Sequence, residues 1–262
     1  MPRFTLVFAA IFLFVCGFFV AQIPTQPIVA DAAQQVGMEM VSAIFVLLLA
    51  LPSYIAVVLW LGWRRGVLVL AVLGVFAIFV ETLAVYTGFP YGQFAHGEKI
   101  GAKLFGAVPW TVPFVWTPLV LAGLALASQI LASRTSYSRT GVLCLGALLL
   151  VAVDLLLDPA AVAQGFWEYR HPSAYYGVPL SNFAGWLVSG FLGCALLMKL
   201  SRWDMSTPLP AGLITSGFLI FVFWTSVALW MSLVFPAFIG VALTALSGWF
   251  VLRREQKTVD MP

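Results

Sequence analysis

Long apolar runs recur along almost the whole chain and are separated by short polar segments. Each run is close to the roughly 20 residues that an α-helix needs to cross the apolar core of a bilayer. The pattern predicts eight membrane-spanning helices, at residues 4–23, 39–61, 66–86, 110–132, 140–158, 181–200, 211–232 and 235–252. The last two runs are nearly continuous, and we expect Pro236 to separate them because proline interrupts a helix.

The composition points in the same direction as the pattern. Of 262 residues, 62% are hydrophobic and 9% are charged, whereas soluble domains are about half apolar and about a quarter charged. A chain of this length cannot bury so much apolar surface in one water-soluble core. We therefore expect an all-α, polytopic integral membrane helix bundle in the cell membrane. It should form a single transmembrane domain over residues 1–262, with membrane lipid as a partner and no nucleic acid.

Apolar sequence also surrounds the N-terminus and the three cysteines. The run that follows Arg3 is longer than the apolar region of a usual signal peptide, so we interpret it as a retained first helix. Cys16, Cys144 and Cys194 lie in apolar runs without C-x-x-C spacing or a histidine close in sequence. Such cysteines are typically small core residues, so we expect neither disulfides nor structural zinc.

The distribution of Lys and Arg predicts the orientation of the helices. With the N-terminus inside, ten of the 13 basic residues fall on the inner side: Arg3, Arg64, Arg65, Arg134, Arg139, Lys199, Arg202, Arg253, Arg254 and Lys257. The outer segments hold the other three: Lys99, Lys103 and Arg170. Because positive charge accumulates in cytoplasmic loops, we expect both chain termini in the cytoplasm.

Two outer segments, 87–109 and 159–180, are long for a compact membrane protein and rich in Gly, Pro and aromatic residues. Long loops of this kind usually carry function or cover a cavity. The sequence shows no internal repeat, low-complexity tract or water-soluble domain. We therefore expect the chemistry of the protein near the outer side of the bundle.

Three carboxyl groups lie in the outer parts of the predicted spans, where ionisable side chains are costly and often functional. At about 1.5 Å per residue, Glu81 and Asp154 lie roughly 6–8 Å below the outer surface, and Asp158 lies at it. Asp154 and Asp158 are four residues apart and share a helix face. Neither run contains Lys or Arg, so apolar surroundings favour a neutral acid that can donate a hydrogen bond. A simpler alternative is that the acids bind loop backbone and hold the outer segments.

Aromatic residues gather around these acids, and many of them are expected to anchor the protein at the membrane surface. The set comprises Tyr91, Trp110, Trp116, Trp167, Tyr175, Tyr176 and Trp186. Anchoring explains Trp116 and Trp186 less well, because both lie several residues inside their runs. Asn182 lies four residues before Trp186 and shares its helix face. An aromatic face stabilises a nearby cation, so the set is also suited to line a reaction pocket.

Metal binding finds little support in the sequence. His96 and His171 lie in the outer segments without ligand spacing to a second His or a Cys, so we interpret both as solvated loop residues. Asp154 and Asp158 match the D-x-x-x-D pattern that membrane prenyltransferases use with magnesium and diphosphate. However, the chain has no second acidic motif, and no basic cluster lies on the same side.

Two stretches between about residues 81 and 186 combine acidic residues with Gly, Pro and aromatic motifs. The first comprises Glu81, TGFPYG at 87–92, GAVP at 106–109 and PFVW at 113–116. The second comprises DLLLDP at 154–159, GFW at 165–167, YYGVPL at 175–180 and NFAGW at 182–186. Together these stretches resemble the signatures of the carotenoid-biosynthesis membrane protein family, which includes carotenoid 1,2-hydratases and bisanhydrobacterioruberin hydratases. Two positions depart from the family pattern: Ala84 stands where glycine is common, and Tyr169 where a second tryptophan is common.

The resemblance implies addition of water across the terminal C1=C2 double bond of an acyclic carotenoid end group, by a cofactor-independent hydro-lyase without a metal. Such a reaction needs a neutral acid, a pocket that tolerates a tertiary carbocation, and a water with a base. We assign the acid to Asp154, and water positioning and proton uptake to Asp158 or Glu81. Asn182 would orient water or a carboxyl. The pocket would be lined by Tyr91, Trp116, Trp167, Tyr176 and Trp186.

Other functions remain open at this point. Glu81 and Asp154 could form the ion or proton site of a small transporter or channel, since membrane carboxylates suit that role. Transporters usually place such groups near the midplane between paired repeats, and here the acids are off-centre. A magnesium-dependent prenyltransferase and a non-catalytic pigment-binding protein of the same pathway are further alternatives. Other carotenoid-pathway enzymes are conceivable partners.

Overall fold

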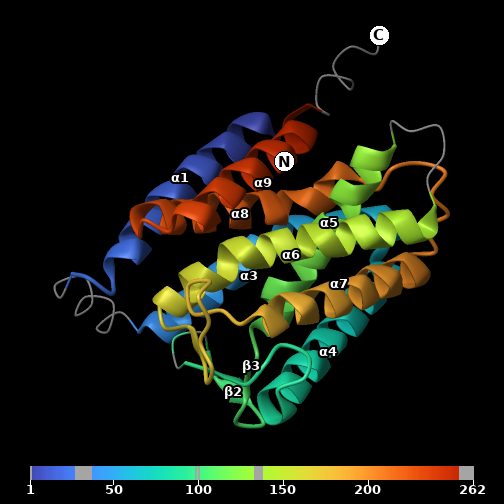
Figure 1. Ribbon diagram of the computed structural model, residues 1–262. Helices are drawn as coiled ribbons and strands as arrows, with labels where there is room; N and C mark the ends of the chain where they lie inside the picture. The colour runs from blue at the N-terminus through green and yellow to red at the C-terminus, as the bar shows by residue number, and fades with distance from the viewer. Residues whose placement is uncertain (1, 27–36, 98, 100, 133–137, 254–262) are drawn as a thin grey trace.

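The computed structural model describes residues 2–26, 37–97, 99, 101–132 and 138–253 (Figure 1). Eight helices in this part of the chain are long and apolar enough to cross a membrane, which confirms the predicted helix bundle. They are α1 (Arg3–Gln22), α3 (Met38–Leu61), α4 (Trp63–Thr87), α5 (Val112–Leu131), α6 (Arg139–Ala163), α7 (Leu180–Ser201), α8 (Thr215–Trp230) and α9 (Val234–Arg253). A short 3₁₀ turn, η1 (Ala211–Ile214), leads directly into α8 and belongs to the same span.

Helix α6 is longer than its apolar run, because it continues through Pro159 to Ala163. Proline has no backbone N–H, so the carbonyl four residues earlier loses its helical partner. That carbonyl belongs to Leu155, and it accepts a 2.9 Å hydrogen bond from the hydroxyl of Tyr175 instead. The end of the apolar run at residue 158 is therefore not the end of the helix: Asp158 lies within α6 and is 3% exposed.

The last two spans are separate helices, but Pro236 does not separate them. The break lies at residues 231–233, between α8 and α9, where Ser232 has a φ of 59°. Pro236 lies in the first turn of α9. A proline is tolerated there because the first N–H groups of a helix have no partner within the helix.

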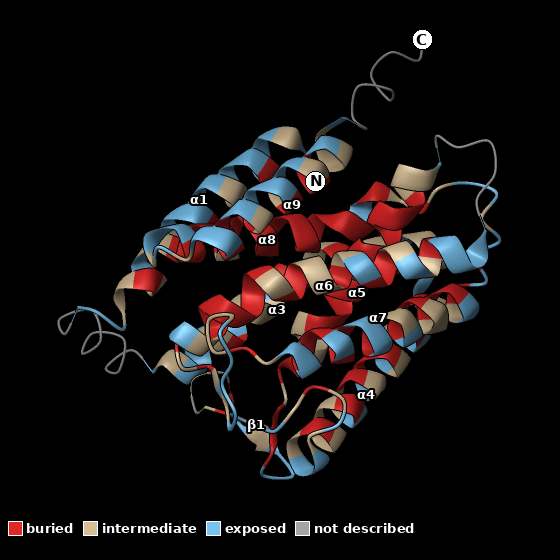
Figure 2. Cartoon of the chain, in the orientation of Figure 1, coloured by how far each residue is buried: buried red, intermediate tan, exposed pale blue. Residues whose placement is uncertain are grey.

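Helix α8 forms the centre of the bundle. Within its span, 89% of an 18-residue window is buried inside the protein, compared with 22% for α1 and for α3. Figure 2 shows the same contrast, with buried residues along α8 and exposed residues along the outer faces of α1 and α9. The exposed residues of α1 are mostly large and apolar, as expected for a lipid-facing helix.

Small and hydroxyl residues let α1 and α3 pack closely on α8. On the α1 side, Gly17 faces Ser226, whose hydroxyl donates a 2.6 Å hydrogen bond to the backbone carbonyl of Phe14. On the α3 side, the backbone N–H groups of Ser53 and Ser216 each donate to the other's hydroxyl, at 3.0 and 3.1 Å. Such contacts are typical of helix packing within membranes. Both α1 and α3 are thus anchored to α8.

Two small antiparallel ribbons join the helices at one end of the bundle, which the sequence did not predict. Strand β1 (Phe94–His96) pairs with β4 (Trp167–Tyr169), and β2 (Lys103–Leu104) pairs with β3 (Val108–Pro109). The first ribbon joins the two long segments that were expected to carry function. It brings together residues that lie more than 70 positions apart in the sequence.

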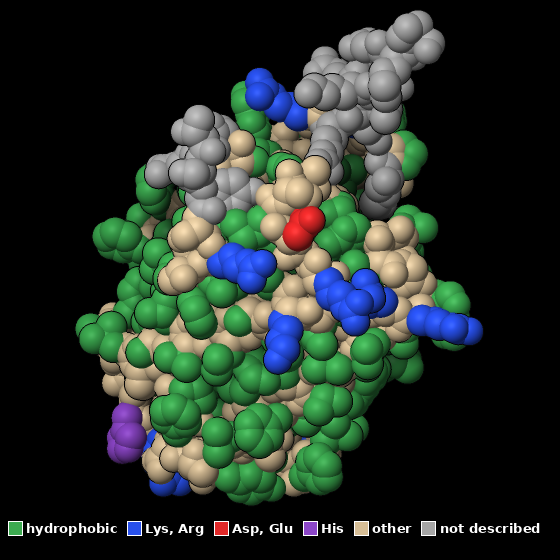
Figure 3. Space-filling model, turned by 90° about the vertical axis from the view of Figure 1, so that its right-hand side faces the viewer, with side chains coloured by type: hydrophobic (Ala, Val, Ile, Leu, Met, Phe, Trp, Pro, Cys, Tyr) green, Lys and Arg blue, Asp and Glu red, His purple; other side chains and the backbone are tan. Residues whose placement is uncertain are grey.

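Both ends of the described chain lie at the opposite end of the bundle. Nε of Arg3, in the first turn of α1, donates a 2.8 Å hydrogen bond to the carbonyl of Leu252, near the end of α9. Lys and Arg side chains are spread over the face shown in Figure 3. Three of the basic residues used to predict the orientation, Arg134, Arg254 and Lys257, lie outside the described residues.

Candidate active site

A cavity of about 370 Å³ lies inside the bundle at the end that carries the ribbons. Its walls are almost entirely apolar and aromatic. A small group of polar side chains projects into one end of it, as is usual for ligand sites. This polar cluster comprises Glu81, His96, Asp158, Tyr169 and Asn182.

Asn182 holds the two aspartates of α6 together. Its side-chain nitrogen lies in the first part of α7 and donates hydrogen bonds of 2.7 Å to Oδ2 of Asp154 and of 2.7 Å to Oδ2 of Asp158. All three side chains are buried, Asp154 completely. The two carboxyls share a helix face as expected, and the neutral amide of Asn182 contacts both of them.

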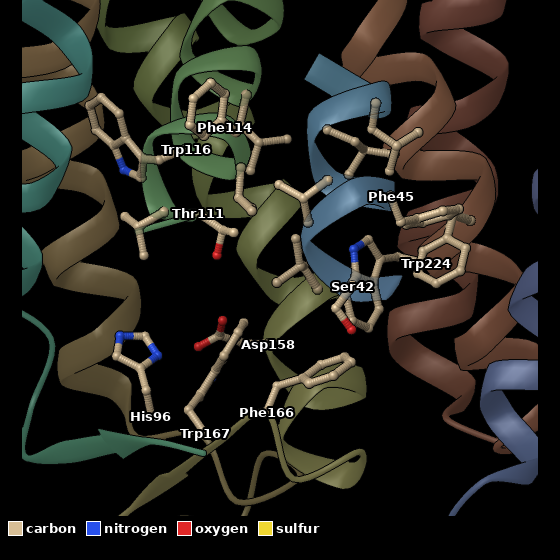
Figure 4. A pocket seen from close by; sticks show the side chains of 18 of the residues that line it. Ser42, Phe45, His96, Thr111, Phe114, Trp116, Asp158, Phe166, Trp167 and Trp224 are labelled. Carbon is tan, nitrogen blue, oxygen red and sulfur yellow. The ribbon is translucent and has the colours of Figure 1, made fainter. Parts of the chain in front are cut away.

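The two aspartates differ in their access to the cavity. Asp158 lines it, and Figure 4 shows its carboxyl pointing into the open space. Asp154 is absent from the described residues that line the cavity, and its Oδ2 accepts a hydrogen bond from Asn182. Oδ1 of Asp154 is buried and has no hydrogen-bond partner within the described part of the chain. The sequence argument from depth alone did not distinguish the carboxyl that reaches the cavity from the one that lies behind it.

Tyr169 is a site residue that the sequence argument missed. Its hydroxyl donates a 2.6 Å hydrogen bond to Oδ2 of Asp158. Burial, and then the neighbouring carboxyls of Asp158 and Asp154, raise the pKa of Tyr169 well above its ordinary value. The phenol therefore stays protonated and acts as a donor. The one available signal was its departure from the tryptophan that is common at this position.

The register of the β1–β4 ribbon explains how this end of the cavity is built. His96 lies opposite Trp167, and Phe94 lies opposite Tyr169. Successive residues of a strand point to opposite faces. All four of these side chains line the cavity, whereas the intervening Ala95 and Glu168 are exposed. The ribbon therefore forms a lid with an aromatic inner face.

His96 is buried, so its interpretation as a solvated loop residue is wrong. Its Nε2 lies 3.4 Å from Oε2 of Glu81 on α4. Both ring nitrogens of His96 and Oε2 of Glu81 are buried without a hydrogen-bond partner among the described residues. Unpaired buried polar atoms are costly and are often functional. His171, by contrast, is exposed, as the sequence suggested.

Aromatic side chains form the walls beside the polar cluster. Trp116 from α5 and Trp186 from α7 line the cavity with Trp167, and Trp116 and Trp186 are nearly fully buried. Tyr91 also lines it, and its hydroxyl donates a 2.9 Å hydrogen bond to the hydroxyl of Ser189. Four of the five predicted pocket aromatics are therefore at the cavity.

Tyr176 is the exception. It is absent from the described residues that line the cavity, and its ring packs at a right angle against Tyr175. Its hydroxyl lies 3.5 Å from the backbone nitrogen of Phe235, at the start of α9. The residue therefore connects the 164–179 segment to the last helix and does not form part of the pocket.

The structure also bears on two alternatives for the acids. The hydrogen bonds of Asp154 and Asp158 go to side chains and not to loop backbone, although the bond from Tyr169 to Asp158 does hold the outer segment that carries β4. Among the described residues, no group of three or more His, Cys, Asp or Glu side chains is placed to hold a metal ion.

Comparison with known proteins adds independent information. A family model described as "Carotenoid biosynthesis protein" matches residues 37–247. A bisanhydrobacterioruberin hydratase from Haloarcula japonica is 35% identical over 133 residues, which make up 51% of this chain and 45% of the relative. The chain thus aligns with less than half the length of this relative. No solved structure matches the chain.

Proposed function

Because the chain belongs to the carotenoid biosynthesis protein family, we propose that it hydrates an acyclic carotenoid end group at its terminal C1=C2 double bond. The observation that carries this proposal is the cavity itself, which is lined by the buried carboxyl of Asp158 and by aromatic side chains. The named activity of the Haloarcula relative supports it. The product would be a tertiary alcohol.

Asp158 is the best candidate for the acid, because it reaches the cavity and Asp154 does not. Its proton would form a C–H bond at C2 with the electron pair of the double bond, which leaves a tertiary carbocation at C1. A water molecule would then form the C–O bond at C1 and release a proton to a base. The sum is one water added to one double bond, with no change in oxidation state.

Asp154 would help Asp158 to hold a proton. Two carboxylates that accept from the same amide nitrogen repel each other strongly inside a protein, so the pair is expected to retain one proton. Asn182 and Tyr169 would keep Oδ2 of Asp158 in place and leave its other oxygen for the substrate.

His96 and Glu81 are the candidates for binding and deprotonating the water. Figure 4 shows His96 beside Asp158 at the same end of the cavity. Nδ1 of His96 has no hydrogen-bond partner among the described residues, and Nε2 lies 3.4 Å from Oε2 of Glu81, so the two side chains together offer donor and acceptor positions to a water molecule. A base on one side and an acid on the other would let water attack the cation as soon as it forms.

The aromatic walls would stabilise the cation and exclude competing water. Trp116, Trp167 and Trp186 present ring faces or edges to the cavity next to the polar cluster. The electron-rich face of an indole attracts a cation within about 6 Å of its centre. We also propose that the basic end of the bundle, where α1 begins and α9 ends, faces the cytoplasm. The cavity would then lie on the outer side.

The proposal is tested by expressing the chain in a bacterium that accumulates lycopene and analysing the pigments by chromatography with mass detection. We expect a pigment heavier by one water, with its hydroxyl at the tertiary end carbon. Asp158→Asn should yield none, whereas Glu168→Gln should behave like the wild type, because Glu168 lies on the outer face of the ribbon. Unchanged lycopene in cells that contain the wild-type protein in their membrane would contradict the proposal for this substrate.

A further inference from the structure

The cavity has an apolar arm that leads away from the polar cluster. Helices α1, α3 and α8 form its walls, and none of their described lining residues is charged. Phe45 packs on Phe223 with ring centroids 4.9 Å apart, and Phe223 packs on Trp224 at 5.2 Å. Figure 4 shows Phe45 and Trp224 across the cavity from His96 and Asp158.

The arm reaches the outer surface of the bundle between two helices. Among the described residues that line the cavity, only Phe19 and Val41 are exposed, at 57% and 40%. Phe19 lies near the end of α1, and Val41 lies in the first turn of α3. Each of these side chains therefore borders both the cavity and the surface that faces lipid.

The packing of the helices explains why an opening exists at this point. α1 is anchored to α8 at Gly17 and Ser226, and α3 is anchored to α8 at Ser53 and Ser216. Both helices are therefore held by α8, and the part of α8 that lies between them forms one wall of the arm, which we call its floor. Ile220, Phe223 and Trp224 lie on this floor, and all three line the cavity.

We propose that the opening between α1 and α3 is the entrance through which one end of a long polyene passes sideways from the bilayer into the cavity. The identity of the occupant rests on the function proposed above. A volume of about 370 Å³ is near the lower end of the roughly 300–1,000 Å³ that drug-sized ligands occupy. It accommodates an end group and the adjoining part of the chain, but not a whole carotenoid.

The rest of the polyene would lie in the arm and beyond it in the lipid while the end group reacts. An apolar, aromatic-walled channel suits this occupant, because no hydrogen-bonding groups of the substrate need partners along it. The entrance also lies directly in the lipid phase, in which the substrate is dissolved. No transfer through water is then required.

A steric test uses two positions on the same helix. Val41→Trp fills the mouth, whereas Ile44→Trp adds the same ring at an exposed position of α3 that does not line the cavity. Overpacking at the mouth should lower kcat/KM for lycopene in proteoliposomes by about tenfold or more, with a smaller change in kcat. Ile44→Trp should stay near the wild-type value. Equal rates for the two variants would overturn the proposal.

A second measurement does not depend on turnover. A photoreactive diazirine amino acid is placed at position 41 or position 44 of the full chain, and lycopene-loaded membranes are illuminated. We expect pigment to become attached at position 41 and not at position 44. Attachment at neither position, or at both equally, overturns the entrance whatever the steric variants show. Selective attachment in a protein that hydrates nothing would uphold the entrance and refute the proposed hydration.

Discussion

The hydroxyl of Tyr169 donates a 2.6 Å hydrogen bond to Oδ2 of Asp158 and so connects the ribbon over the cavity to the buried face of α6. The same oxygen also accepts a hydrogen bond from Asn182. Two donors from two different elements therefore fix one oxygen of the proposed acid. Its position depends on the lid as well as on its own helix.

This relationship predicts a graded effect of substitutions at Tyr169. Tyr169→Phe removes a donor to the carboxylate that Asp158 becomes as it gives up its proton, and a hydrogen bond to a charged group contributes about 1.5–3 kcal/mol. We expect hydration of lycopene to slow by about 10- to 100-fold. Tyr169→Trp keeps an N–H donor and should lose less. Rates are compared at equal amounts of membrane protein, and a Phe variant as fast as the wild type would show that the bond does not contribute to catalysis.

Asn182 should affect both stability and activity, because one nitrogen serves two buried carboxyls. Asn182→Leu leaves those oxygens without this partner, which costs about 1–3 kcal/mol for a buried polar group. We expect a lower thermal midpoint in detergent and loss of hydration. Ala184→Ser, on an exposed face of the same helix, is the control. An Asn182→Leu variant with normal midpoint and normal activity would contradict the role of the amide.

His96 and His171 form a natural pair for testing the proposed base. His96→Ala should slow hydration by about 10²- to 10⁴-fold, the usual contribution of a general base. Added imidazole should restore part of the rate, because the substitution leaves space beside Glu81. His171→Ala should have no effect, since His171 is exposed and outside the cavity. Equal rates for the two alanine variants would remove His96 from the mechanism.

The helices could be predicted from the sequence because each depends on a continuous apolar run of about the thickness of a bilayer. A predicted helix end differs from the structure where a residue far away in the sequence supplies a hydrogen bond that the local sequence lacks. The predicted span ends at residue 158, whereas α6 continues to Ala163, because the hydroxyl of Tyr175 replaces the hydrogen bond that Pro159 cannot make. That compensation lies 20 residues from Leu155 and has no local signature in the sequence.

The site was predictable where residues share a helix and not where strands bring them together. Asp154 and Asp158 are four residues apart, so their common face followed from helix geometry. His96 and Tyr169 enter the cavity because two three-residue strands pair in a particular register. Strands that short have no periodic signal, and a shift by one residue would turn both side chains outward. Tyr176 was misplaced for a different reason, since it lies in a turn and the path of the loop decides which way its side chain points.

An entrance that admits one end group at a time predicts the order of products from lycopene, which has two identical ends. The pigment with one added water should appear first and be released, because the second end must leave the bilayer and enter separately. The pigment with two added waters should follow after a lag. A time course of both products in proteoliposomes measures this order. Appearance of the doubly hydrated pigment without the singly hydrated one would contradict it.

The source of the added atoms tests the central claim most directly. Lycopene is incubated with the purified protein in detergent in D₂O, with the oxygen of the water labelled as ¹⁸O, and the product is analysed by mass spectrometry. We predict one deuterium fixed at C2 and one ¹⁸O at C1, with no product from Asp158→Asn. Oxygen derived from dissolved O₂, absence of deuterium at C2, or a full yield from Asp158→Asn would contradict acid-catalysed hydration at this site.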